Sequence, residues 1–349
     1  MNGITRVLVV DDSAYVRKVI KEILSKSPML EVVGVARDGE EALELCETLQ
    51  PDVVTLDLIM PNLDGLGFIQ KQMAIRPVPI VVVSIASETG TMALKALDMG
   101  AVDFLQKPTA LATDKVYEIS RELIEKVRTA SAIPLAKVQP LPETMAEPEP
   151  AHRLLTPERR IDMVVMGIST GGPQGLKLVI PRFAADFPVP IAIVLHMPVG
   201  YTELYAKNLD SISRLRVIEA QEGLKVEPGT VLLAQAGRHL LFRREADDTV
   251  YTHLDAKPFD TPHRPSVDVL FRSAAEVYRN RVLGVVMTGM GQDGLQGSAW
   301  IKAQGGIILT EAEESCVVYG MPRSVVEAGL SDRRVPLHQM TEAILETVG

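Results

Sequence analysis

The chain has 349 residues and a mass of 38.0 kDa, a length typical of two or three domains. Hydrophobic residues make up 46% and charged residues 23%, a composition that excludes a disordered chain. The net charge is −9, divided into −7 for residues 1–158 and −2 for residues 159–349. Because neither part has a basic excess, we expect no nucleic-acid partner.

Residues 1–128 alternate apolar, strand-like runs with amphipathic helical stretches. The five predicted strands cover residues 6–10, 31–36, 53–56, 80–84 and 102–105. Fully apolar strands that alternate with helices are typical of a parallel sheet covered on both faces. We therefore predict a five-stranded (βα)5 domain.

Residues 129–158 hold six of the 23 prolines and contain no glycine and no aromatic residue. Proline fixes φ and removes a hydrogen-bond donor, so neither a helix nor a central strand is expected here. We interpret this segment as an interdomain linker.

Residues 159–349 repeat the α/β pattern on a larger scale. Strands are predicted at residues 161–168, 190–196, 281–288 and 305–310. Residues 230–253 alternate more strongly and are interpreted as a β-hairpin insertion. The prediction is a doubly wound, mostly parallel α/β domain with a β-hairpin.

No run of 18 or more apolar residues occurs, and the N-terminus has no apolar core behind a basic head. We therefore expect no membrane insertion and a cytoplasmic location. Cys46 and Cys316 lie in apolar stretches and are predicted to be unpaired core residues.

Charged side chains follow three strands of the first domain. Asp11 and Asp12 follow the first strand, Asp57 follows the third and Lys107 follows the fifth. Carboxyl ends of parallel strands meet at one edge of the sheet. Three carboxylates and a lysine there predict a Mg²⁺ site, where an aspartate could accept a phosphoryl group. Asp11 or Asp12 alone could instead be a helix cap.

Two further residues lie near this edge. Ser84 ends the fourth strand, and its hydroxyl could hydrogen-bond the new phosphoryl oxygens. Phe104 lies three residues before Lys107. Its position is compatible with a core residue or with an aromatic side chain that changes orientation.

The motifs VVDDS, TLDLIMPNLDG, VVVS and FLQKP occur in this order, and residues 4–125 resemble a bacterial response-regulator receiver domain. The resemblance implies that Asp57 is the phosphoacceptor and that Asp11, Asp12, Asp57 and the backbone carbonyl of Ile59 bind Mg²⁺. It implies a histidine kinase as phosphodonor. It also assigns the conformational response to three residues, Ser84, Phe104 and Lys107.

The strand at 161–168 runs into a glycine-rich turn, GISTGGP, with Ser169 at its apex. Gly167-x-Ser169-x-Gly171 matches the nucleophile-elbow pattern, although such a turn can also bind phosphate or only reverse the chain. His196 ends the next strand, and Asp293 lies in the loop after strand 281–288. All three side chains follow carboxyl ends of predicted parallel strands, where a Ser-His-Asp triad could form.

The order of these residues along the chain, Ser–His–Asp, differs from the order in α/β-hydrolases. Backbone N–H groups of Thr170 and of the loop near Met290 could form an oxyanion hole. His263 and Arg264 could line the substrate cleft.

Two alternatives remain open on residues alone. Gly289-x-Gly291-x-x-Gly294 follows a strand, and Glu311 ends the next one, as in a nucleotide-binding oxidoreductase. A receiver coupled to a DNA-binding output is the other alternative, which the charge of residues 159–349 disfavours.

The motifs GISTGGP, VLHMP, HRPSVDVLF, MTGMGQDG and EESCVVYGMP resemble the catalytic domain of the chemotaxis protein-glutamate methylesterase family, over residues 160–345. The resemblance implies that Ser169, His196 and Asp293 form the triad. It implies hydrolysis of γ-glutamyl methyl esters on chemoreceptor cytoplasmic helices, deamidation of receptor glutamines and no cofactor for the esterase step. The unphosphorylated receiver is expected to cover the catalytic rim.

Overall fold

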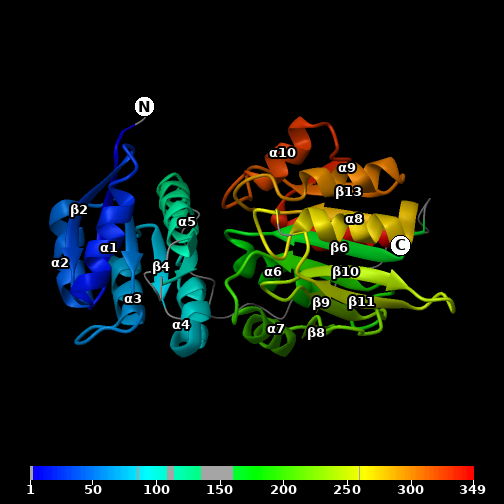
Figure 1. The fold of residues 1–349 in the computed structure, drawn as a ribbon, viewed down its shortest axis with the longest axis horizontal. Coiled ribbons are helices and arrows are strands. Elements are labelled where there is room, and N and C mark those ends of the chain that lie inside the picture. Colours follow the sequence, from blue (N-terminus) through cyan, green and yellow to red (C-terminus); the bar gives the residue numbers. More distant parts are fainter. Residues whose placement is uncertain (1–2, 85, 108–113, 135–159, 259) are drawn as a thin grey trace. The chain divides into compact units, whose positions relative to one another are not determined.

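The computed structural model describes residues 3–84, 86–107, 114–134, 160–258 and 260–349. The chain divides into two compact units, Met1–Glu143 and Thr144–Gly349, and each is described by itself (Figure 1). In the described part of the chain, no helix has the length and apolar character needed to cross a bilayer.

The first unit is a parallel sheet in the order β2-β1-β3-β4-β5. Its strands are β1 (Thr5–Val10), β2 (Leu30–Ala36), β3 (Val53–Leu56), β4 (Ile80–Ser84) and β5 (Asp103–Gln106). Its helices are α1 (Ala14–Leu24), α2 (Gly39–Leu49), α3 (Gly65–Ile75), α4 (Ala86–Asp98) and α5 (Asp114–Ser131). The predicted strands are confirmed to within one residue.

Side-chain caps set the beginnings of three of these helices. Ser13, Asp38 and Asp64 accept backbone N–H groups in the first turns of α1, α2 and α3. Such caps satisfy donors that a helix leaves unpaired at its start. The central strands β3 and β4 are buried along their whole length, as a sheet covered on both faces requires.

Helix α5 corrects the predicted start of the linker. It continues to Ser131, whereas the linker was predicted to begin at residue 129. The first proline of that segment is Pro134, so residues 129–131 keep their backbone donors and the helix ends before the proline. Residues 135–158 of the predicted linker lie outside the described residues.

The second unit is built on a seven-stranded, fully parallel sheet in the order β14-β13-β12-β6-β7-β9-β8. Its strands are β6 (Met163–Ile168), β7 (Ile191–Leu195), β8 (Arg216–Glu219), β9 (Thr230–Leu233), β12 (Val282–Val286), β13 (Ile307–Glu311) and β14 (Arg333–Val335). Strand order reverses where β6 lies between β7 and β12. Ligands of doubly wound sheets bind at the carboxyl ends near such a reversal.

The α-helices of this unit are α6 (Gly172–Val179), α7 (Thr202–Ser211), α8 (Val267–Tyr278), α9 (Leu295–Ala303), α10 (Met321–Glu327) and α11 (Met340–Val348). The described residues of this unit also form three short 3-10 helices, η2 (Ile180–Arg182), η3 (Arg279–Arg281) and η4 (Leu337–Gln339). Helix α8 packs against α9, β6 and β10 (Figure 1). The start of α8 therefore lies near the strands that carry the candidate site.

The interpretation of residues 230–253 as one hairpin insertion is partly wrong. Strands β10 (His239–Arg244) and β11 (Val250–Asp255) form the expected antiparallel pair. Strand β9, in contrast, joins the main sheet between β7 and β8. The reason is that Val231, Leu232 and Leu233 are all fully buried, so this stretch does not alternate as a half-exposed hairpin strand would. Strands β8 and β14, which form the edges of the sheet, were not predicted from the sequence.

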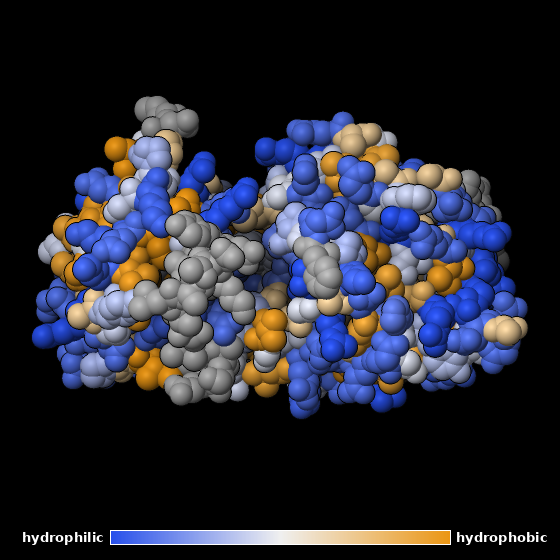
Figure 2. All heavy atoms as spheres, viewed as in Figure 1, coloured by the Kyte–Doolittle hydropathy of each residue, from blue (hydrophilic) through white to orange (hydrophobic). Residues whose placement is uncertain are grey.

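The surface and the cysteines agree with the composition. Figure 2 shows hydrophilic side chains over much of the drawn face, with smaller hydrophobic areas between them. Cys46 and Cys316 are buried, and neither forms a disulfide among the described residues, as predicted. Burial raises the pKa of the Cys46 thiol to about 11.

Candidate active site and phosphoacceptor site

The predicted acidic cluster of the first unit is present. Carboxylate oxygens of Asp11, Asp12 and Asp57 lie within 4.8 Å of one another. Lys107 Nζ lies 2.7 Å from Asp11 Oδ2 and 2.6 Å from Asp57 Oδ2. Asp12 is exposed, whereas the other three side chains are buried. Residues from the ends of β1, β3 and β5 therefore meet at one edge, as the parallel topology predicted.

The charges of this cluster influence one another strongly. Burial raises the pKa of Asp57, although Lys107 acts to lower it. Burial also raises the pKa of Asp11, and the Asp57 carboxylate adds to this effect. Burial alone would lower the pKa of Lys107, but its hydrogen bonds to both carboxylates raise it overall. Lys107 thus contacts two of the three carboxylates, and the three together form a set of hard oxygen donors that fits Mg²⁺.

The other residues predicted for this site, Ser84, Phe104 and Ile59, differ in burial. Ser84, at the end of β4, is buried, and its carbonyl accepts the N–H of Lys107 at 2.8 Å. Phe104 is buried in β5. Ile59 follows Asp57 by two positions and is exposed. The roles predicted for these three residues, like the metal-binding role of the acids, stay predictions.

Arg17 was not predicted as part of this site. Its Nη1 donates to the backbone carbonyls of Asp11 at 2.6 Å and Asp12 at 3.0 Å. The arginine therefore holds the loop that presents both aspartates. Its spacing, five residues after Asp12 on α1, was the only signal in the sequence.

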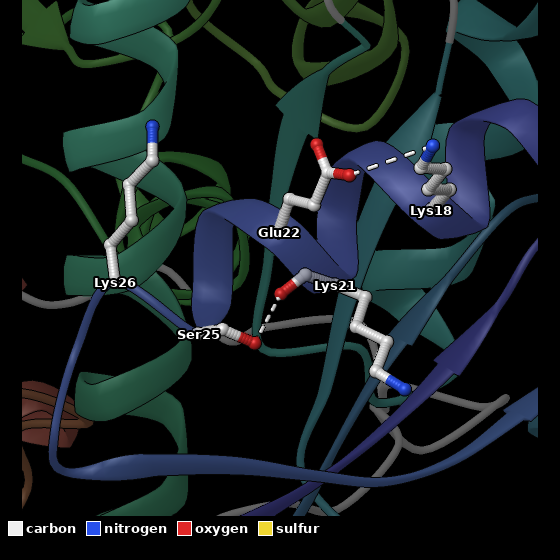
Figure 3. Close-up of a pocket in the computed structure, with 5 residues that line it drawn as sticks. All are labelled: Lys18, Lys21, Glu22, Ser25 and Lys26. Atoms are coloured by element: carbon white, nitrogen blue, oxygen red, sulfur yellow. Dashed lines mark hydrogen bonds and ion pairs between the residues drawn. The ribbon is translucent and has the colours of Figure 1, made fainter.

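A surface hollow on the same helix is separate from the acidic cluster. It is lined by Lys18, Lys21, Glu22, Ser25 and Lys26 (Figure 3). Lys18 and Glu22 form an exposed ion pair at 3.9 Å, and the Ser25 hydroxyl donates to the Lys21 carbonyl. These residues occupy the later part of α1 and the turn after it, whereas Asp11 and Asp12 precede the helix. The hollow therefore adds nothing to the acidic cluster.

The predicted strand–turn–helix around Ser169 is confirmed in the second unit. Strand β6 ends at Ile168, and α6 begins at Gly172. Gly171 has φ +79°, and a Cβ atom there would lie 2.6 Å from the Val317 side chain. The N–H of Gly172 donates to the Ser169 carbonyl at 2.6 Å, which closes the turn. Glycine is needed here for both conformation and space.

His196 lies beside this turn on the next strand. Ile168 of β6 pairs with Leu195 of β7, and the His196 N–H donates to the Ile168 carbonyl at 3.1 Å. Ser169 and His196 thus follow paired residues of adjacent strands. The His196 Nε2 lies 2.9 Å from Asp293 Oδ2. The other ring nitrogen, Nδ1, is buried and makes no hydrogen bond to any residue that the structure describes.

The Asp293 carboxylate lies at the start of α8. Its Oδ1 accepts from Ser266 Oγ and from the Asp268 N–H, both at 2.9 Å. Its Oδ2 accepts from the Val267 N–H at 2.8 Å as well as from His196. Burial acts to raise the pKa of Asp293, but the hydrogen bond and charge of His196 and these backbone donors hold it well below its usual range. The carboxylate is therefore ionised and fixed in direction.

Asp268 is a further residue that the sequence analysis missed. Its Oδ1 accepts the N–H groups of Gly294 at 2.9 Å and Gly297 at 2.7 Å. Burial and the nearby charge of Asp293 raise the pKa of Asp268 to about 6. The available signal was the sequence Ser266-Val-Asp, a capping serine followed by an acid in the first helical turn.

The loops that carry Thr170 and Met290 are adjacent. The Ser169 N–H donates to the Thr288 carbonyl at 3.0 Å. A Cβ atom at Gly289 would lie 2.8 Å from the Ser169 Cβ, so only glycine permits this approach. The oxyanion role predicted for Thr170 and Met290 stays a prediction, and these contacts show that their loops are neighbours.

The nucleotide-binding alternative does not fit the structure. Glu311 is fully buried and accepts from the Thr288 N–H and the Ser315 hydroxyl, each at 2.9 Å. It is therefore not exposed to a ribose. The Gly289 carbonyl accepts the N–H groups of Gly320 and Met321, so the start of the glycine loop is occupied by the chain itself.

His263 and Arg264 were predicted to line the cleft. The His263 ring stacks on His196, with centroids 4.1 Å apart and planes inclined by 24°. The Arg264 carbonyl accepts the Gly237 N–H at 2.9 Å. His263 is thus in direct contact with the candidate triad, and Arg264 follows it in the loop before α8.

Known proteins resemble both units. Residues 7–115 match the family described as response regulator receiver domain, and residues 164–344 match CheB methylesterase. Protein-glutamate methylesterase/protein-glutamine glutaminase 5 of Myxococcus xanthus is 50% identical over 337 residues, which cover 96% of this chain and 95% of that protein. The Thermotoga maritima protein-glutamate methylesterase/protein-glutamine glutaminase is 39% identical and covers 99% of each chain. The crystal structure of the Thermotoga maritima CheB methylesterase catalytic domain, 40% identical, superposes with a TM-score of 0.52 and covers 54% of this chain and 99% of that one.

Proposed function

Because this chain belongs to the CheB family of protein-glutamate methylesterases, we propose that it hydrolyses γ-glutamyl methyl esters on the cytoplasmic helices of chemoreceptors. We extend the proposal to deamidation of receptor glutamines, the second activity in the relatives' names. The observation that carries it is the His196–Asp293 pair beside the Ser169 turn. A buried carboxylate, an imidazole and a hydroxyl on neighbouring strand ends form an acyl-transfer site.

In the proposed mechanism, the Ser169 Oγ attacks the ester carbonyl carbon while its proton passes to Nδ1 of His196. The Nε2–H of His196 donates to Asp293, whose charge stabilises the imidazolium. Backbone N–H groups of Thr170 and Met290 bind the oxyanion, close to the start of α6. The imidazolium then protonates the departing methanol.

The second half of the reaction returns the enzyme to its resting state. Water attacks the acyl-serine as His196 takes its proton, and glutamate leaves with Ser169 protonated again. With a glutamine substrate, ammonia leaves in the first half-reaction in place of methanol. The triad supplies every proton transfer, so we propose no cofactor for the esterase step.

In the receiver, we propose that Asp57 accepts a phosphoryl group from a histidine kinase. Asp11, Asp12, Asp57 and the Ile59 carbonyl would hold Mg²⁺, which would offset the charge of the transferred group. Lys107 Nζ already contacts the Asp57 carboxylate and would move to contact the phosphoryl oxygens. Its contact with Asp57 would then change on phosphorylation, and the buried Ser84 and Phe104 would respond to that change.

We further propose that phosphorylation relieves an inhibition of the catalytic unit by the receiver. It adds about 1.5 to 2 negative charges at Asp57. Such a local change acts by shifting a two-state equilibrium between covered and accessible forms of the site. The proposed location is the cytoplasm, where the kinase and the receptor helices are expected to be.

The test measures methanol release from methylated chemoreceptor, with and without a small phosphodonor and Mg²⁺. Ser169→Ala should abolish release, whereas Ser298→Ala, a buried serine of α9, should not. Asp57→Asn should keep the basal rate and lose the response to the phosphodonor. No release from the wild type would reject the esterase, and an Asp57→Asn protein that still responds would reject the proposed control.

A further inference from the structure

Thr288 connects the loops on both sides of the candidate oxyanion hole. It follows β12 by two positions, and its side chain is 1% exposed. Neither the triad nor the substrate requires a hydroxyl at this position. A buried hydroxyl is costly unless it makes hydrogen bonds, so its partners indicate its role.

On one side, Thr288 holds the turn that carries the nucleophile. Its carbonyl accepts the Ser169 N–H at 3.0 Å, and its Oγ1 donates to the Thr170 carbonyl at 3.0 Å. These contacts fix the peptide groups before Ser169 and after Thr170. The peptide between them carries the Thr170 N–H, so its direction is set from both ends.

On the other side, Thr288 holds the segment that supports the Met290 loop. Its Oγ1 accepts the Val318 N–H at 2.9 Å. The Val318 carbonyl in turn accepts the Gly289 N–H at 3.0 Å, immediately before Met290. The buried carboxylate of Glu311 accepts the Thr288 N–H and fixes the residue itself.

We propose that the Thr288 hydroxyl is a positioning group that sets the spacing between the two oxyanion donors, the N–H groups of Thr170 and Met290. This inference rests on the proposed esterase function. The Thr288 hydroxyl donates to the Thr170 carbonyl and accepts the N–H of Val318, whose own carbonyl accepts the Gly289 N–H. Its removal releases both loops at once, without removing a group that touches the substrate.

Oxyanion donors act only at about 2.7 to 3.1 Å from the developing charge, so a small displacement of either loop weakens them. The loss falls on the transition state, because the ground-state carbonyl gains less from these donors. We therefore expect a lower kcat with little change in KM.

Two pairs of proteins isolate the hydroxyl. Wild type and Thr288→Val differ mainly by hydroxyl against methyl, and Thr288→Ser and Thr288→Ala differ only by the hydroxyl. The second pair still decides the question if the valine variant does not fold. Thr341→Val is the matched control, since Thr341 is also buried and its Oγ1, in α11, donates to a backbone carbonyl, that of Val179, at 3.0 Å.

The readouts are kcat and KM for methanol release and the rate at which a fluorophosphonate labels Ser169. Labelling forms a phosphorus–oxygen bond at Oγ, expels fluoride and leaves the serine proton with His196. We expect Thr288→Val and Thr288→Ala to lower kcat and the labelling rate about tenfold or more, with KM within about twofold. Thr288→Ser should stay within about threefold of wild type, and Thr341→Val should match wild type.

The proposal is overturned if Thr288→Val or Thr288→Ala keeps kcat within about twofold of wild type, or if Thr288→Ser loses as much as Thr288→Ala. It is also overturned if only KM changes. If wild type labels at Ser169 but releases no methanol, the proposed substrate is wrong. The labelling rates of the Thr288 variants still test the positioning role in that case.

Discussion

The carboxylates of Asp293 and Asp268 each accept backbone N–H groups at the start of a neighbouring helix. Asp293, just before α9, accepts from Val267 and Asp268 at the start of α8, at 2.8 and 2.9 Å. Asp268, in α8, accepts from Gly294 and Gly297 at the start of α9. Because each carboxylate lies at a positive helix end, both helices hold the candidate triad acid in place.

The pH dependence of stability should reveal Asp268. Its pKa in the folded protein, about 6, is above the ordinary value, so the folded state binds more protons than the unfolded state between about pH 4 and 6. The free energy of unfolding of wild type should therefore fall relative to Asp268→Asn as the pH rises through this window. We expect a relative change on the order of 1–2 kcal/mol, allowing for the partial exposure of Asp268.

The free energy of unfolding is measured by urea unfolding at each pH. Unfolding is followed by the fluorescence of Trp300, the only tryptophan, which lies in α9. The exposed Asp186→Asn is the control and should follow wild type at every pH. A constant difference between wild type and Asp268→Asn from pH 4.5 to 7.5 would contradict the raised pKa.

Asp293→Asn should lower kcat for methanol release about 10³- to 10⁴-fold. An amide at this position cannot accept the full set of donors from His196, Ser266 and α8, so the imidazole loses its orienting partner and the charge that stabilises its protonated form. Asp162→Asn is the control, because Asp162 pairs with Arg160 and Arg281 at the amino end of β6 and should leave kcat unchanged. Fluorophosphonate labelling should fall in parallel with kcat, and a variant with near-wild-type kcat would remove Asp293 from the triad.

The sequence allowed prediction of residues whose position depends on strand topology. Asp11, Asp57 and Lys107, and likewise Ser169 and His196, directly follow apolar strands, and a parallel sheet brings such ends together. Arg17, Asp268 and Thr288 were missed because each binds backbone groups of a loop or of a helix start. Their partners become neighbours only after helices and loops pack, so no local periodicity indicates them.

The wrong assignment of β9 to the hairpin has a similar explanation. Strand β9 was grouped with β10 and β11 because the three apolar runs are close in sequence. Its membership in the main sheet depends on pairing with β7 and β8, which lie before it in the chain. Burial on both faces distinguishes it, and the three consecutive apolar residues after Thr230 were the available signal.

Lys107→Met should destabilise the receiver unit. The substitution leaves Asp11 and Asp57 buried without their cation, a loss of about 3–5 kcal/mol for a broken buried pair. Adding Mg²⁺ should raise the melting temperature of this variant more than that of wild type, since the divalent ion restores a cation among the carboxylates. Scanning calorimetry of the full chain measures both effects.

Lys18→Met is the matched control for this measurement. Its ion pair with Glu22 is exposed, with both side chains more than half accessible, so its removal should change stability by less than about 1 kcal/mol. Equal melting temperatures for Lys107→Met and Lys18→Met without Mg²⁺ would show that the buried contacts of Lys107 do not stabilise the receiver.

His263 should contribute to catalysis through its contact with His196. The stacked rings limit how far the His196 imidazole can turn, while Asp293 fixes one of its nitrogens. His263→Ala removes this support and should lower kcat about tenfold, because a displaced base loses its alignment with Ser169. His263→Phe keeps a planar ring of similar size and should retain most of the activity.

His253→Ala, at an exposed histidine paired with Glu222, is the control. Equal losses in His263→Ala and His263→Phe would instead assign a polar role to the His263 ring, such as a hydrogen bond to substrate, and would exclude stacking as its main contribution.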